Sequence, residues 1–185
     1  MPHANAELPA PLASLLSMCN GFYVFESALH VFPSAATSTE RAVTEWNAPG
    51  VWRDAYLDLE SSWWFFAEDI FGGQFALGDG VCTFDPETGA MSPIADDIEG
   101  WAGAVLDGYD VMTGFPLAHE WQVRNGSLRP GRRLVPKVPF VLGGEFSVDN
   151  LYDGDSVEAM RYRGQLASQI RDLPDGATVT LRIVN

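Results

Sequence analysis

Apolar and polar residues alternate along the middle of the chain in short runs of β-strand length. Turn-forming residues separate four such runs, which cover residues 63–66, 74–77, 81–84 and 90–94. Asp79-Gly80 favours a tight hairpin because glycine accepts the positive φ that such a turn needs. The segment 85–89 (Asp-Pro-Glu-Thr-Gly) is typical of a second turn. The pattern therefore predicts an antiparallel meander over residues 63–94.

Helical periodicity follows this meander. An apolar stripe predicts a helix whose buried face is Ile98, Trp101, Ala102, Val105 and Leu106. Asp96 and Glu99 fit a capping box at its start. A second capping box, Asp155 with Glu158, predicts a helix with the buried face Val157, Met160, Gly164, Ala167 and Ile170.

Three further helices and a last strand complete the prediction. The helices are expected over residues 12–19 (with Leu12, Leu15, Leu16 and Cys19 inward), from Ser38 or Thr39 to about Trp46, and around 117–124. Val179, Leu181 and Ile183 alternate with polar residues and predict a closing strand. We therefore expect one α+β domain over residues 1–185, with a largely antiparallel twisted sheet flanked by helices and residues 1–8 as a flexible tail.

The net charge of the chain restricts its possible binding partners most strongly. The chain of 185 residues has 25 acidic and 11 basic residues and a net charge of −14. Nearly all of the imbalance lies before residue 111, where Arg41 and Arg53 are the only basic residues. Such a field repels nucleic acid and anionic membranes. One interpretation is that it keeps the protein soluble, and the other is that it steers a basic partner onto this half of the chain.

Targeting signals and cysteine use favour the cytoplasm. The first seven residues lack the basic and apolar regions of a secretion signal, and no run approaches the length of a transmembrane helix. Only Cys19 and Cys82 occur, both in apolar surroundings, which argues against a disulfide framework. We interpret both as small core residues.

Catalytic and metal-binding patterns are absent from the sequence. No Gly-x-Ser-x-Gly elbow occurs, and we interpret His30 and His119 as structural. The acidic segment 149–160 departs from a calcium loop because Leu151 and Met160 stand where ligands belong. We therefore predict no catalytic residue, no metal and no cofactor. The pairs Glu68-Asp69 and Asp96-Asp97 leave a hydrolase open, which a cleft with a raised carboxyl pKa would favour.

Three stretches resemble a known family. They are residues 66–75 (FAEDIFGGQF) followed by 84–89 (FDPETG), the 98–106 helix with Gly100-Trp101, and residues 139–146 (PFVLGGEF) with 149–152 (DNLY). Together they resemble the SUKH superfamily, in particular the bacterial homologues of the yeast Smi/Knr regulator of cell-wall synthesis. The resemblance covers approximately residues 62–184 and implies an α+β fold without catalytic residues.

For most bacterial members, the resemblance implies an immunity role. Such proteins sit in the cytoplasm and neutralise polymorphic toxins, often nucleases or deaminases. The expected function is therefore a non-catalytic immunity protein that binds a basic toxin domain. The alternative is a regulatory scaffold of signalling or cell-wall machinery, as the yeast relatives suggest. The oligomeric state is left open.

The expected contact residues are carboxylates bordering the meander and the 98–106 helix. Most lie in turns or at the end of an element, so we expect them to be exposed. An apolar patch at Trp63-Trp64 is the next candidate. The full set is Glu68, Asp69, Asp79, Asp85, Glu87, Asp96, Asp97, Glu99, Trp63 and Trp64.

Overall fold

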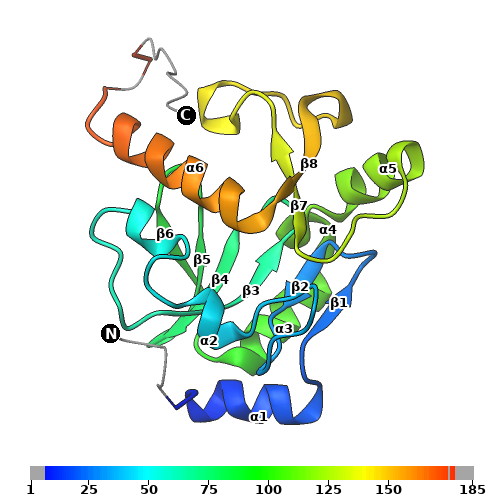
Figure 1. The fold of residues 1–185 in the computed structure, drawn as a ribbon, viewed down its shortest axis with the longest axis vertical. Coiled ribbons are helices and arrows are strands. Elements are labelled where there is room, and N and C mark those ends of the chain that lie inside the picture. Colours follow the sequence, from blue (N-terminus) through cyan, green and yellow to red (C-terminus); the bar gives the residue numbers. More distant parts are fainter. Residues whose placement is uncertain (1–6, 175, 178–185) are drawn as a thin grey trace.

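Six strands form one antiparallel sheet in chain order in the computed structural model, which describes residues 7–174, 176 and 177. Each strand pairs with the next, so the sheet is a meander (Figure 1). The strands are β1 (Phe22–Val24), β2 (Leu29–Val31), β3 (Trp64–Asp69), β4 (Gln74–Gly78), β5 (Gly80–Phe84) and β6 (Met91–Ala95). The predicted meander is confirmed, and it extends by two strands on its N-terminal side.

Helices cover the sheet and two strands form a second, smaller one. The small sheet pairs β7 (Arg132–Pro136) with β8 (Leu151–Asp155). The helices are α1 (Ala10–Met18), α2 (Val43–Trp46), α3 (Ile98–Asp107), α4 (Tyr109–Thr113), α5 (Phe115–Asn125) and α6 (Ser156–Ile170). Short 3-10 turns are η1 (Arg53–Ala55), η2 (Phe140–Leu142) and η3 (Val148–Asn150). This is an α+β fold, as the sequence predicts.

Strand β3 is the centre of the core because both of its faces are buried. On one face, the ring of Phe66 meets the indole of Trp101 from α3 edge to face, with ring centroids 4.9 Å apart. On the other face, Phe65 packs against Trp52 at 4.9 Å. Because neighbouring strand residues point to opposite faces, consecutive aromatic residues serve both layers.

The small sheet joins the large one at the end of β3. The backbone amide of Leu134 in β7 donates to the carbonyl of Ile70 over 2.8 Å. The amide of Ser156, the first residue of α6, donates to the carbonyl of Gly131 over 3.1 Å. These bonds bring the 68–75 segment, β7 and α6 together, and the two candidate cavities lie around this junction.

Helix α3 begins one residue later than the sequence pattern suggests. Asp97 is its N-cap, and its side chain accepts a hydrogen bond from the amide of Gly100 over 2.7 Å. Trp101 and Val105 are buried as expected, but Leu106 is 69% exposed. The predictions of an Asp96 cap and an inward Leu106 are therefore wrong. Leu106 lies at the edge of the apolar stripe, next to the solvent face that Glu99 and Gly103 occupy.

Other helix predictions had mixed outcomes. The Asp155 cap of α6 is confirmed, with bonds from the amides of Val157 and Glu158. Helix α2 begins only at Val43, because the hydroxyl of Thr37 organises a turn by accepting bonds from the amides of Thr39 and Glu40. Cys19 follows the end of α1 and is exposed, so its prediction as a core residue is wrong, whereas Cys82 is buried. The predicted strand with Val179, Leu181 and Ile183 lies outside the described residues.

Candidate functional site

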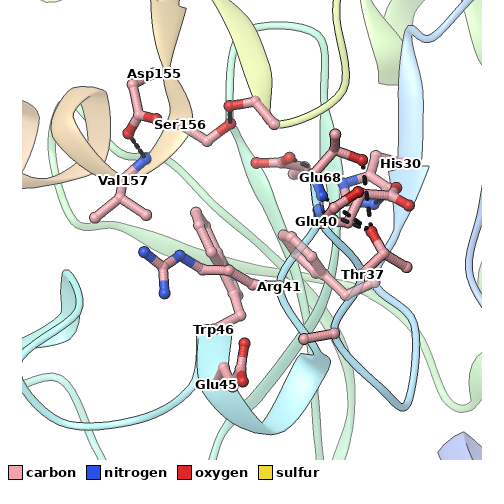
Figure 2. A pocket seen from close by; sticks show the side chains of 15 residues that line it. His30, Thr37, Glu40, Arg41, Glu45, Trp46, Glu68, Asp155, Ser156 and Val157 are labelled. Carbon is pink, nitrogen blue, oxygen red and sulfur yellow. Dashed lines mark hydrogen bonds and ion pairs between the residues drawn. The ribbon is translucent and has the colours of Figure 1, made fainter.

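Two cavities flank the junction of the two sheets, and acidic side chains from β3 line both. The first, the His30 cavity, has a volume of about 460 Å³ and is bordered by His30, Glu68, the 36–41 loop, α2 and the start of α6. Figure 2 shows His30, Glu40 and Glu68 converging at one side of this cavity, with Asp155 and Ser156 at another.

A buried charge cluster forms one side of the His30 cavity. The Nε of Arg133 lies 2.9 Å from Oε1 of Glu68, and both side chains are almost fully buried. Nδ1 of His30 lies 3.1 Å from the same oxygen, and its Nε2 lies 3.3 Å from Oε1 of Glu40. Burial opposes ionisation of Glu68, but the charge of Arg133 and the contact with His30 outweigh it and lower the pKa of this carboxyl. Glu68 is thus a paired carboxylate inside the fold.

Aromatic rings enclose this cluster. Tyr23 stacks on the imidazole of His30 with ring centroids 4.1 Å apart, and the guanidinium of Arg133 lies 5.5 Å from the Tyr23 ring centre. Burial raises the pKa of the Tyr23 hydroxyl. The cluster links β1, β2, β3 and β7 through ion pairs within the protein, although Nη2 of Arg133 has no hydrogen-bond partner among the described residues. The interpretation of His30 as structural agrees with this arrangement.

The second cavity, the Asp69 cavity, has a volume of about 380 Å³ and a mostly apolar lining. Its aromatic wall comes from Phe71, which follows β3, from Phe140, the first residue of η2, and from Phe146, which follows η2. Its charged groups are those of Asp69 from β3, Asp85 and Glu87 from the 85–89 turn, and Arg163 from α6.

Asp69 is held at the end of β3 by its own turn. Its Oδ1 accepts hydrogen bonds of 2.8 Å from the amides of Phe71 and Gly73. Burial raises the pKa of the Asp69 carboxyl to about 7, although these two amides and the nearby charges of Arg163 and Arg133 act in the opposite direction. A carboxyl near pKa 7 changes its charge within the physiological range.

Glu87 and Arg163 reach the same cavity with one unpartnered polar atom each. Oε2 of Glu87 accepts a bond of 2.8 Å from the amide of Val141, whereas its Oε1 has no partner among the described residues. Burial raises the pKa of Glu87, while the amides of Val141 and Phe140 and the charge of Arg163 lower it. Nη1 of Arg163 donates to the carbonyl of Phe71, and Nη2 has no partner in the described part of the chain.

The backbone beside Arg163 accommodates the guanidinium. Gly72 has a φ of +79°, and a Cβ at this position would lie 3.2 Å from Nη2 of Arg163. A side chain there would be strained by its backbone and crowded by the guanidinium. Tyr56 holds Pro86, which also lines the cavity, by donating to its carbonyl over 2.8 Å, and the same hydroxyl lies 3.2 Å from the carbonyl of Met160 in α6.

The eight carboxylates chosen from the sequence divide between opposite ends of the sheet. Asp79 precedes strand β5 at one end and Asp85 follows it at the other. The first end has four exposed carboxylates, Asp79, Asp96, Asp97 and Glu99. The other end has Glu68, Asp69, Asp85 and Glu87. At this second end the expectation of exposure is wrong for Glu68 and Glu87, which are 1% and 4% exposed, and Asp69 is only partly exposed.

The Trp63-Trp64 pair is not an exposed apolar patch. Trp64 is buried in β3. Trp63 is half-buried, and its ring lies so close to Gly78 that a Cβ there would be 2.5 Å from it. Both residues are shielded because they stand at the start of β3, and both faces of this strand are covered. They therefore belong to the core and its margin.

Sequence patterns did not identify Arg163, Arg133, Phe140 or Phe146 as site residues. One signal was present for Arg163, which stands between Met160 and Gly164 within the predicted buried face of α6. A charged residue in such a face is buried only with polar partners or in a site. Arg133 lies in the extended segment before β8, and its pairing with Glu68 depends on the association of the two sheets.

Among the described residues, no group of three or more His, Cys, Asp or Glu side chains has the geometry to hold a metal ion. No helix in that same part of the chain combines the length and apolarity needed to cross a bilayer.

Comparisons with known proteins address the fold alone. No protein-family model and no curated protein sequence matches the chain. Its structure is similar to the crystal structure of Atu4351 from Agrobacterium tumefaciens, with a TM-score of 0.61 and 14% sequence identity. The match covers 85% of this chain and 76% of Atu4351. The fold is therefore shared with a solved protein, and the SUKH resemblance stays a prediction.

Proposed function

We propose that this protein is a non-catalytic immunity protein that binds and neutralises a basic toxin domain. The observation that carries the proposal is an acidic surface along α3, with exposed apolar residues at its far end. We define the α3 surface as Asp79, Asp96, Asp97, Glu99, Leu106, Asp107, Asp110 and Val111.

The α3 surface combines one sign of charge with apolar area. Residues 96–113 contain five acidic residues and no lysine, arginine or histidine. Leu106 is 69% exposed and Val111 is 85% exposed. Pairing of Val81 with Ala95 places the Asp79 turn beside the start of α3, where Asp96 and Asp97 lie. Apolar side chains with a charged rim are typical of protein-binding surfaces.

The charge also suits the proposed partner. Nuclease and deaminase toxins act on nucleic acids, and enzymes of this kind present basic surfaces to phosphate. An acidic surface accelerates encounter with such a cleft and offers carboxylates in place of phosphates. We place this activity in the cytoplasm, where an incoming toxin of this class finds its nucleic-acid target.

Recovery of the partner and a titration test the proposal. The full chain is used to capture its partner from the native cell, and the recovered toxin domain is then expressed with and without this protein. We expect co-expression to restore growth and purified protein to abolish toxin activity at one equivalent. The proposal would be contradicted if this protein protected against none of the recovered toxin domains.

A hydrolase is the second candidate because the Asp69 cavity contains carboxyl groups with raised pKa values. Asp69 and Glu87 resemble an acid–base pair in that respect. However, backbone amides of Phe71, Gly73 and Val141 already hold one oxygen of each carboxyl. The same titration separates the two functions: an enzyme would neutralise many equivalents of toxin, whereas a binding protein neutralises one.

A further inference from the structure

The Asp69 cavity has polar atoms that lack partners, and it is separate from the α3 surface. Glu87 and Arg163 are 4% and 2% exposed, yet Oε1 of the first and Nη2 of the second make no hydrogen bond within the described chain. Asp69 is partly exposed, and both of its amide bonds use Oδ1 and leave Oδ2 to the cavity. Buried polar groups are normally satisfied, so exceptions grouped around one cavity indicate a missing ligand.

The aromatic wall of this cavity is ordered by its own contacts. The rings of Phe140 and Phe146 stack with centroids 3.9 Å apart and planes within 5°. The ring of Phe71 meets that of Phe140 edge to face at 5.5 Å. Phe146 is nevertheless 67% exposed and Val141 is 41% exposed. The opening of the cavity therefore exposes apolar side chains to solvent, and the charged groups lie deeper.

We propose that the Asp69 cavity binds an arginine side chain of the protein partner. The guanidinium pairs with the free oxygens of Asp69 and Glu87, and the stem packs against Phe71, Phe140 and Phe146. This inference rests on the proposed function and specifies how the basic partner is recognised at a second contact point.

Charge and shape favour arginine over other ligands. Three carboxyl groups, those of Asp69, Asp85 and Glu87, line the cavity with one guanidinium, that of Arg163, so the ionised cavity has a net negative charge that disfavours an anion. Nη1 of Arg163 donates to the carbonyl of Phe71, and its Nη2 needs an acceptor, which a peptide carbonyl of the bound residue offers, so the carboxyl oxygens remain for the guanidinium of the ligand. A planar guanidinium offers paired donors to carboxylates and stacks on aromatic faces, whereas a lysine ammonium is a strongly hydrated point charge.

Binding of a cation is linked to proton release. Burial raises the pKa of Asp69 to about 7 and also raises that of Glu87, with Asp85 adding to the second effect and Arg163 opposing both. A cation pairs with the ionised carboxylates, so it lowers both pKa values. Affinity therefore increases as pH rises through about 7, and protons leave the protein on binding.

A small probe tests the inference without the partner. Nα-acetyl-L-arginine methylamide is titrated into the full chain labelled with nitrogen-15, and the neutral citrulline analogue is the control ligand. We expect the arginine probe alone to shift the amide signals of Phe71, Phe140, Val141 and Phe146, with tighter binding at pH 8 than at pH 6. Equal binding of both probes, or shifts confined to other segments, would overturn the inference.

Matched variants locate the contact. Asp69→Asn and Glu87→Gln keep an oxygen for the backbone amides and remove the charge, and Phe146→Ala alters an exposed ring. The two carboxyl variants are each expected to weaken binding of the arginine probe by at least about tenfold, the size of one charge-assisted contact, and Phe146→Ala should weaken it by loss of ring contact with the guanidinium and its stem. Asp172→Asn, which changes an exposed carboxylate that belongs to neither the Asp69 cavity nor the α3 surface, is the control and should bind like the native protein. Unchanged affinity in the three cavity variants would contradict the inference while leaving neutralisation through the α3 surface intact.

Discussion

The Nε of Arg133 lies 2.9 Å from Oε1 of Glu68, and each side chain is 1% exposed. This pair joins the small sheet to β3 and leaves neither charge in contact with solvent. A buried ion pair contributes little net stability relative to an apolar pair, but removal of one partner leaves the other charge buried and unpaired. The pair therefore makes the association of the two sheets sensitive to single substitutions.

Glu68→Gln should destabilise the protein by about 3–5 kcal/mol, because the Arg133 charge loses its counter-ion in the core. Urea unfolding followed by circular dichroism measures this change. The double variant Glu68→Leu/Arg133→Met removes both charges and should be markedly more stable than Glu68→Gln. A loss below about 1 kcal/mol in the single variant would show that the pair is solvated in solution.

Stability should fall as pH rises from about 4 to about 7 because of Asp69. Its pKa is raised from an ordinary value of 3.8 to about 7 in the fold. Between these values the folded protein retains a proton that the unfolded chain has lost, so rising pH favours unfolding. Thermal unfolding at pH 5 and pH 7.5 measures the effect.

Asp69→Asn removes this titration but keeps a side-chain oxygen that accepts from the amides of Phe71 and Gly73. The variant should therefore lose less stability than the native protein as pH rises. The native change should be about 2 kcal/mol, below the ~4 kcal/mol of a three-unit shift, because the side chain is partly exposed. The ionisation of Glu68 affects the free energy of unfolding at lower pH and in the opposite direction. Its lowered pKa adds stability that is lost as pH falls below about 4.5. An identical pH profile for native protein and Asp69→Asn would contradict the account of Asp69.

Trp101→Ala should destabilise the protein by about 3–5 kcal/mol through lost burial and a cavity. Trp101 is 3% exposed and meets both Phe66 and Phe75 edge to face. Leu106→Ala on the same helix is the control and should change stability by less than about 0.5 kcal/mol, since this side chain is largely exposed. Similar losses in the two variants would mean that α3 is rotated relative to the sheet.

The fold was predictable where local chemistry determined it. Asp79-Gly80 marks a hairpin because few residues accept the φ of +95° found at Gly80. Asp155 caps α6 for an equally local reason. The start of α3 was wrong by one residue because Asp96 and Asp97 are equivalent in pattern, and only the backbone geometry selects between them. The sequence of residues 22–25 and 29–32 also predicts short extended pieces, and β1 and β2 lie there, but strands of three residues are too short to predict their pairing.

The site was less predictable because distant segments build it. A sequence pattern shows Glu68, Asp69 and Glu87 as acidic residues near turns, which usually means exposure. Their burial depends on Arg133, Arg163 and η2, which lie about 50 to 100 residues away along the chain. Asp79, Asp96 and Asp97 lie in turns and Glu99 in the first turn of α3, where no described segment covers them, and there the predicted exposure is confirmed.

The association rate constant of this protein with the recovered toxin domain tests the central claim most directly. It is measured for native protein, for Asp96→Lys/Glu99→Lys on the α3 surface, and for the control Glu158→Lys/Asp172→Lys around α6. All four residues are exposed, and both pairs change the net charge equally. If the α3 surface steers the partner, its variant associates at least ~10-fold more slowly, the control stays within about twofold of native protein, and rising salt narrows the difference. Equal rates for the two variants, or a native rate that is insensitive to salt, would contradict binding through the α3 surface.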